Sequence, residues 1–72
     1  MPPPSADPHA YYVAPRFAGG WAVRRGTGQR EVETFERKAD AERFAIERAR
    51  KDVTRLYIHR ENGTVSEMRS YA

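Results

Sequence analysis

The chain has 72 residues and carries thirteen Lys and Arg against ten Asp and Glu, which gives a formal net charge of +3. This length suits one small domain with a limited core, and the mildly basic charge is compatible with a nucleic-acid partner without requiring one. The absence of cysteine excludes disulfides, thiolate metal sites and thiol redox chemistry. No apolar run approaches the roughly 20 residues of a membrane span, and the N-terminus has no signal-peptide pattern. We therefore expect a cytoplasmic protein with no membrane partner.

The N-terminal segment, residues 1–9, holds four of the five prolines and almost no apolar side chain. Proline lacks the backbone N–H that helices and sheets use, and so polar a segment buries too little apolar surface to offset the entropy of ordering. We therefore expect a disordered, proline-rich tail at residues 1–9, followed by a single domain over residues 10–72.

Short strands with glycine-containing turns between them are expected in the first half of the domain. Trp21 and Val23 share one face of a strand, because successive side chains in a strand point to opposite faces. The same alternation puts Arg25 on the face of Trp21. Glycines follow or precede each segment and indicate tight turns, so we predict antiparallel neighbours. The expected strands are residues 9–13, 21–25 and 30–35.

One helix is expected over residues 35–52, where small and apolar residues recur at spacings of three and four. The small side chains would let the helix backbone lie close to the sheet, while Arg48 could bury its stem and keep its guanidinium at the rim. Charges of both signs occupy the remaining positions, as expected of a solvated surface. The predicted core side is formed by Ala41, Phe44, Ala45, Arg48 and Ala49.

A second hairpin is expected after the helix, from strands at residues 55–59 and 64–71. A two-residue turn at Asn62 and Gly63 would set Glu67 opposite Ile58, on the face beneath the helix. We therefore favour a three-residue loop, residues 61–63, with Gly63 left-handed at a bulge; Leu56 then pairs with Met68, and Tyr57 with Glu67. The expected fold is α+β: an antiparallel sheet of about five short strands, in the order strand-strand-strand-helix-strand-strand, with one helix packed on one face.

One helix cannot cover both faces of a sheet, so the face opposite the helix is expected to meet water or a partner. The second hairpin contributes aromatic and apolar side chains to this open sheet face. They are Tyr57, His59, Val65 and Tyr71.

The order of several short segments resembles the bacterial family catalogued as domain of unknown function 2188. The resemblance covers residues 10–72 and rests on Tyr12-Val-Ala-Pro-Arg16, Gly20-Trp-Ala-Val-Arg24, Lys38-Ala-Asp-Ala41, Leu56-Tyr-Ile-His59 followed by Gly63, and Arg69-Ser-Tyr71. It supports the architecture and implies no activity, cofactor or ligand.

This chain departs from the family pattern at two positions. The family usually has threonine before the helix lysine and glycine after Ser-Tyr, where this chain has Arg37 and Ala72. A threonine cap is worth about 1 kcal/mol to a helix end.

No catalytic or metal-binding constellation is found in the sequence. His9 lies in or beside the tail and His59 on a strand, while a general base needs a positioned partner within hydrogen-bond reach. Ser66 and Ser70 have no histidine at a motif spacing. Two distant histidines and scattered carboxylates also match no metal-ligand spacing. We therefore expect no enzymatic activity, no catalytic residue, no metal site and no cofactor.

Two kinds of binding function remain. The first is DNA or RNA binding, in which a basic hairpin contacts phosphates and Trp21, Tyr57 and His59 add stacking; Trp21 could equally belong to the core. The second is a protein-interaction module, in which the open sheet face meets a second copy or another protein. The arginines of the hairpin, with no acidic residue between them, are Arg16, Arg24, Arg25 and Arg30.

Overall fold

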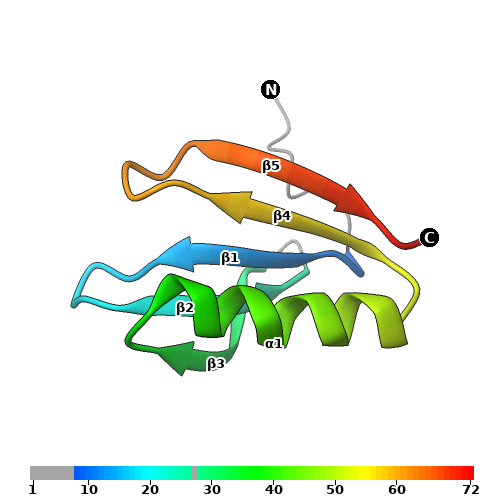
Figure 1. Ribbon diagram of the computed structural model, residues 1–72, viewed down its shortest axis with the longest axis horizontal. Coiled ribbons are helices and arrows are strands. Elements are labelled where there is room, and N and C mark those ends of the chain that lie inside the picture. Colours follow the sequence, from blue (N-terminus) through cyan, green and yellow to red (C-terminus); the bar gives the residue numbers. More distant parts are fainter. Residues whose placement is uncertain (1–7, 27) are drawn as a thin grey trace.

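The computed structural model describes residues 8–26 and 28–72, and shows one helix lying against a five-strand sheet (Figure 1). The α+β class and the expected order of elements are confirmed. Of the expected tail, residues 1–7 lie outside the described residues, and Pro8 and His9 are exposed in a turn. The elements are β1 (Tyr11–Pro15), β2 (Trp21–Arg25), β3 (Arg30–Phe35), α1 (Lys38–Lys51), β4 (Arg55–His59) and β5 (Val65–Ser70).

The sheet is mixed, with the strand order β3-β2-β1-β4-β5. The expectation of an antiparallel sheet was wrong at one pair, because β1 and β4 run parallel, with Tyr12 opposite Tyr57. The helix explains this difference. It carries the chain back across the sheet after β3, so β4 starts at the same end as β1 and fills the free position beside it (Figure 1).

The core lies between α1 and the sheet. On the helix, Ala41, Ala45 and Ala49 are fully buried, as their spacing predicted. Phe44 is half-buried, and its ring centroid lies 5.5 Å from that of Phe35. The guanidinium carbon of Arg48 lies 5.5 Å from the centre of the Phe44 ring, at the rim of the core as expected, but the residue as a whole is exposed. The sheet side of the core is formed by Tyr11, Val13, Trp21, Val23, Leu56 and Ile58.

Trp21 therefore belongs to the core. Only 9% of its surface is exposed, and the Lys38 ammonium lies 5.0 Å from the centre of its ring. Its indole is thus occupied by the fold, which removes it from the set of candidate stacking residues.

The hairpin β4–β5 starts in the expected register, with Val65 opposite His59, but its pairing shifts by one residue farther from the loop. Ile58 faces Glu67, Tyr57 faces Met68 and Leu56 faces Arg69, with a bulge between Ile58 and His59. The expected Leu56–Met68 and Tyr57–Glu67 pairs were wrong, because the bulge shifts the pairing by one residue. The preference against a Glu67–Ile58 pair assumed that the helix covers β5. In the described part of the chain α1 contacts β1 to β4 and not β5.

Glu67 can therefore face the helix side of the sheet and still reach water. Its Oε2 accepts a hydrogen bond from Arg69 Nε at 2.6 Å, and this bond raises the pKa of Arg69. Gly63 has φ +87°, as the proposed loop required, and Asn62 Oδ1 accepts hydrogen bonds from the N–H and hydroxyl of Thr64. The loop chemistry was predicted correctly, and only the pairing beyond it differs.

The backbone groups at the start of α1 have fewer hydrogen-bond partners than those at its end. Arg37 occupies the N-cap position with extended backbone, and within the described residues its side chain makes no capping hydrogen bond. At the other end Thr54 N–H donates to the Ala49 carbonyl and Val53 N–H to the Arg50 carbonyl, which completes a Schellman motif. Val53 takes φ +54° there, an unfavourable conformation for a β-branched residue.

Replacing Arg37 with threonine should stabilise the domain by about 1 kcal/mol, because the new hydroxyl can accept a hydrogen bond from a backbone N–H that the helix leaves unpaired. Urea unfolding followed by circular dichroism would measure the change. The same substitution at the exposed helix position Arg43, which is not a cap, should give no gain. Equal effects at both positions would contradict the capping explanation.

Candidate nucleic-acid interface

Three aromatic rings lie in a row across the sheet face opposite α1. Tyr12 of β1 and Tyr57 of β4 are opposite each other in the register, and their rings stack with centroids 5.2 Å apart and planes 11° apart. The His59 ring approaches the Tyr12 ring edge-on, with the ring centroids 6.4 Å apart. Alternation along each strand places these side chains on the face away from the helix, since Tyr11, Val13, Leu56 and Ile58 point into the core.

Tyr12 is the member of this row that sequence reasoning missed. It is 1% exposed and supports Tyr57, which is only half-buried. The signal was present, because Tyr12 alternates with the buried Tyr11 and Val13. What was missing was the parallel pairing that brings β1 beside β4. Tyr57 and His59, the members that reach solvent, were both predicted.

His59 also has a structural role in the hairpin. Its Nδ1 lies 2.8 Å from the carbonyl oxygen of Gly63. A carbonyl can only accept, so Nδ1 carries a proton, and in the neutral ring Nε2 is then the acceptor. This bond fixes the orientation of the ring beside Tyr12, and Val65 lies opposite His59 in the register.

Tyr71 does not join the open sheet face. It packs against the helix-side core, and its N–H donates to the carbonyl of Thr54 at 3.0 Å. The register explains this correction. Met68 pairs with Tyr57 and Ser70 pairs with Arg55, so both lie on the sheet face away from the helix. The next residue along must point to the helix side.

The four hairpin arginines do not form one patch. Arg16 and Arg24 meet on the open side, where Arg16 Nε lies 3.4 Å and Arg24 NH2 3.5 Å from the same oxygen, Oε2 of Glu31. Glu31 follows the hairpin in sequence but faces Arg24 across the β2–β3 register. One carboxylate is thus shared by two guanidinium groups. Within the described residues, the buried Nε of Arg24 has no acceptor.

Arg25 lies on the helix side, on the face of Trp21 as alternation predicted. Its guanidinium carbon is 4.9 Å from the centre of the Tyr11 ring, and its NH1 is 3.5 Å from Oδ2 of Asp52. The Tyr11 hydroxyl donates to the same carboxylate. This hydrogen bond, with the charge of Arg25, holds the pKa of Asp52 below its ordinary value, while burial and the bond to Asp52 raise the pKa of Tyr11. Arg25 therefore has a partner in the fold.

Arg30 faces Arg25 in the β2–β3 register, and both line a hollow of about 420 Å³ with Tyr11 and Arg48. This hollow is on the helix side of the sheet. The predicted site is consequently divided by the sheet, with Arg16 and Arg24 beside the aromatic row and Arg25 and Arg30 on the other side.

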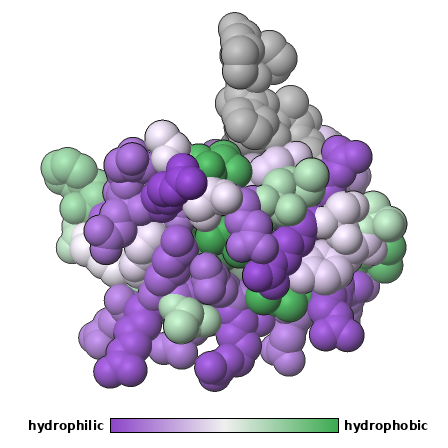
Figure 2. All heavy atoms as spheres, turned by 45° about the horizontal axis from the view of Figure 1, so that its top comes forward, coloured by the Kyte–Doolittle hydropathy of each residue, from purple (hydrophilic) through white to green (hydrophobic). Residues whose placement is uncertain are grey.

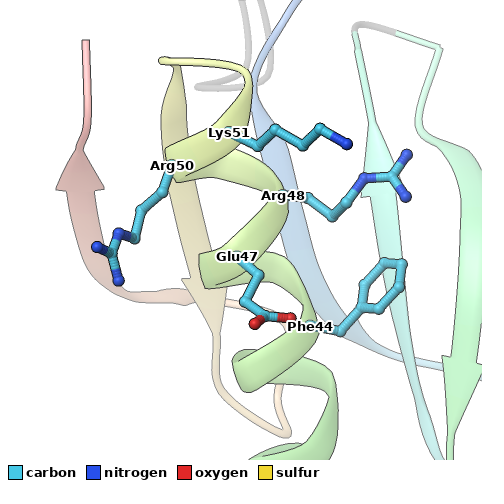
Figure 3. Close-up of a pocket in the computed structure, with 5 residues that line it drawn as sticks. All are labelled: Phe44, Glu47, Arg48, Arg50 and Lys51. Atoms are coloured by element: carbon cyan, nitrogen blue, oxygen red, sulfur yellow. The ribbon is translucent and has the colours of Figure 1, made fainter.

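The surface of α1 carries a larger shallow hollow of about 700 Å³ (Figure 3). Its lining residues all come from this one helix, and in the close-up Phe44 and Arg48 extend toward one side of it while Arg50 extends toward the other. Side chains that diverge from a single helix do not enclose a ligand. We therefore place the candidate interface on the sheet. The lining residues are Phe44, Glu47, Arg48, Arg50 and Lys51.

Within residues 8–26 and 28–72, no three His, Cys, Asp or Glu side chains gather closely enough to hold a metal ion. In the same part of the chain, the helix is neither long nor apolar enough to cross a bilayer.

Comparison with known proteins supports the family resemblance seen in the sequence. No curated protein and no solved structure gives a significant match to the chain. A family model matches residues 11–71, which include every helix and strand of the domain. The chain therefore belongs to the family described as uncharacterized proteins conserved in bacteria, DUF2188.

Proposed function

We propose that this domain is a non-enzymatic module that binds single-stranded DNA or RNA on the sheet face opposite α1. The observation that carries the proposal is the row of Tyr12, Tyr57 and His59 beside Arg24, on a face that the helix leaves uncovered. Single-stranded nucleic acid offers unpaired bases that stack on aromatic rings and phosphates that bind guanidinium groups. A cytoplasmic location fits this proposal.

The charges on this face favour an anion. Arg16 and Arg24 share the carboxylate of Glu31, so this group of three keeps one net positive charge. The side chain of Arg24 is 28% exposed, and that of Arg16 35% exposed. Both can exchange a weak contact with Glu31 for a phosphate oxygen, which accepts charge-assisted hydrogen bonds from the same planar fork. Arg24 is opposite Tyr12 in the register, which places the phosphate contact next to the aromatic row.

A protein partner on the same face is the second candidate. Met68 lies opposite Tyr57 and is 52% exposed, and the half-buried Val65 lies opposite His59. These side chains form an apolar strip along the β4–β5 part of the face, of the kind that a second copy or another protein would cover. The strip and the arginines lie on opposite sides of Tyr12, so the two candidates can be separated by substitution.

Changing Arg16 and Arg24 together to alanine should weaken binding to fluorescently labelled single-stranded DNA and RNA of any sequence. If both contact phosphate, the slope of log affinity against log salt should fall by about 1.4, since each contact to a single strand contributes about 0.7. Fluorescence anisotropy at several salt concentrations measures both quantities. Circular dichroism checks that the variant is folded.

The matched control replaces Arg25 and Arg30, which lie on the other side of the sheet, with alanine. This variant loses the same charge but should keep the larger part of the affinity. Equal losses in both double variants would mean that net charge, rather than this face, determines binding. Failure of the unmodified protein to bind either nucleic acid at low salt would refute the proposal and favour the protein partner.

A further inference from the structure

The outer edge of β5 is one of the two ends of the sheet. Within residues 8–26 and 28–72 nothing pairs with this edge, because β5 is last in the strand order (Figure 1). Tyr71 N–H donates to Thr54, toward β4, and backbone groups alternate in direction along a strand. The N–H and C=O groups of Met68 and Ser70 therefore point outward, away from β4.

The two edges of the sheet differ in how they are protected. On β3 the register shifts at Val32, and the acidic residues Glu31 and Glu33 stand on either side of the shift. A bulge and repeated like charges are devices that discourage strand pairing. On β5 the register shift lies near the start of the strand, and its remaining part has neither proline nor lysine. Figure 2 brings this side of the molecule forward and shows hydrophilic and hydrophobic residues mixed over it.

Charge selects one register for an antiparallel pair of β5 strands. Hydrogen bonds form between the two strands only when residues with outward-pointing backbone groups face each other. The two-fold axis that relates the strands can therefore pass beside residue 67, 68 or 69. Centring on Glu67 or on Arg69 brings two like charges face to face. Centring on Met68 instead places Glu67 opposite Arg69 of the second copy, twice, and this is the arrangement that stabilises cross-strand pairs.

We propose that two copies of this chain pair through β5, antiparallel, with Met68 opposite Met68 of the second copy. The two sheets become one continuous sheet, and the two-fold axis puts both helices on one side and both aromatic rows on the other. Because α1 does not extend over β5 in the described part of the chain, it does not block the second copy. Glu67 and Arg69 are already bonded within each strand, and in the pair they form a four-membered cluster of alternating charge.

This contact is separate from the nucleic-acid face. It uses the edge of the sheet and does not require a ligand, although it would join two binding faces side by side. An interface of one short strand is small, and interfaces below about 1,200 Å² are generally weak and reversible. The expected association is therefore a monomer–dimer equilibrium that depends on protein concentration.

Sedimentation velocity on protein free of nucleic acid, up to about 1 mM, tests the proposal, since a weak interface needs concentrations in this range. The unmodified chain should shift reversibly toward a dimer. Glu67→Arg and Arg69→Glu should each weaken association at least about tenfold, because each turns two attractive pairs into two repulsive ones. Glu47→Arg, the same charge change on the exposed surface of α1, should leave it unaltered.

Two restorations make the test specific. The double variant with Glu67→Arg and Arg69→Glu should associate again, and so should an equimolar mixture of the two single variants, in which opposite charges face each other once more. Monomeric behaviour of the unmodified chain at every concentration would overturn the proposal, and so would single variants that associate as well as it does. The Arg16 and Arg24 double variant should still form the dimer, which separates this result from the nucleic-acid test.

Discussion

Replacing Leu56 with alanine is expected to lower the free energy of unfolding by about 2 to 5 kcal/mol. Leu56 is fully buried in the cluster that joins β4 to the alanine side of α1. Removing its branched end loses the transfer free energy of the buried atoms and leaves a cavity that neighbouring strands cannot close. A domain of this size rarely has more than about 3 to 5 kcal/mol of stability in total, so the variant should be largely unfolded at room temperature.

Urea or thermal unfolding followed by circular dichroism measures this effect. Phe17→Ala is the matched control, because Phe17 stands fully exposed in the β1–β2 turn and its substitution removes an even larger apolar group. We expect that control to stay within about 0.5 kcal/mol of the unmodified chain. A Leu56→Ala protein as stable as the control would show that β4 does not pack under the helix.

Replacing Gly20 with alanine is expected to cost about 2 to 4 kcal/mol, the second largest effect. Gly20 has φ +79°, and a Cβ at this position would lie 2.6 Å from the backbone oxygen of Phe35. The left-handed conformation alone costs an L-residue about 1 to 2 kcal/mol. The remainder comes from forcing β3 away from the β1–β2 turn, since the atom in the way is backbone and cannot rotate aside.

Gly63→Ala separates these two contributions. Gly63 has a similar φ, +87°, but a Cβ there would meet no atom within 4 Å. That variant should lose only about 1 to 2 kcal/mol of unfolding free energy, the conformational part of the effect. Chemical unfolding of the two variants side by side gives the steric part as a difference, and equal losses would contradict the close approach of Phe35 to Gly20.

The candidate site could be predicted only in part. The positions of Tyr57 and His59 follow from strand alternation in a single segment. The structure places both side chains on the sheet face opposite α1, as expected. Tyr12 could not be assigned to their row, because its neighbour depends on which strand lies beside β1. The grouping of the hairpin arginines failed for a related reason: Glu31 and Asp52 come from other parts of the chain and reach Arg24 and Arg25 only after folding.

Local sequence patterns by themselves determined the elements of this protein. The spacing of Ala41, Ala45 and Ala49 fixed the helix and its buried side, and alternation fixed the strands and the common face of Trp21 and Val23, because these choices depend on the repeat of the backbone. Pairing between distant segments was decided only by the tertiary structure. The helix returns the chain beside β1, which makes β1 and β4 parallel. Within the described residues it does not contact β5, which lets Glu67 lie on the helix side in water. Neither the direction nor the reach of the helix is encoded in the residues of β5, so its register could not be obtained from its own pattern.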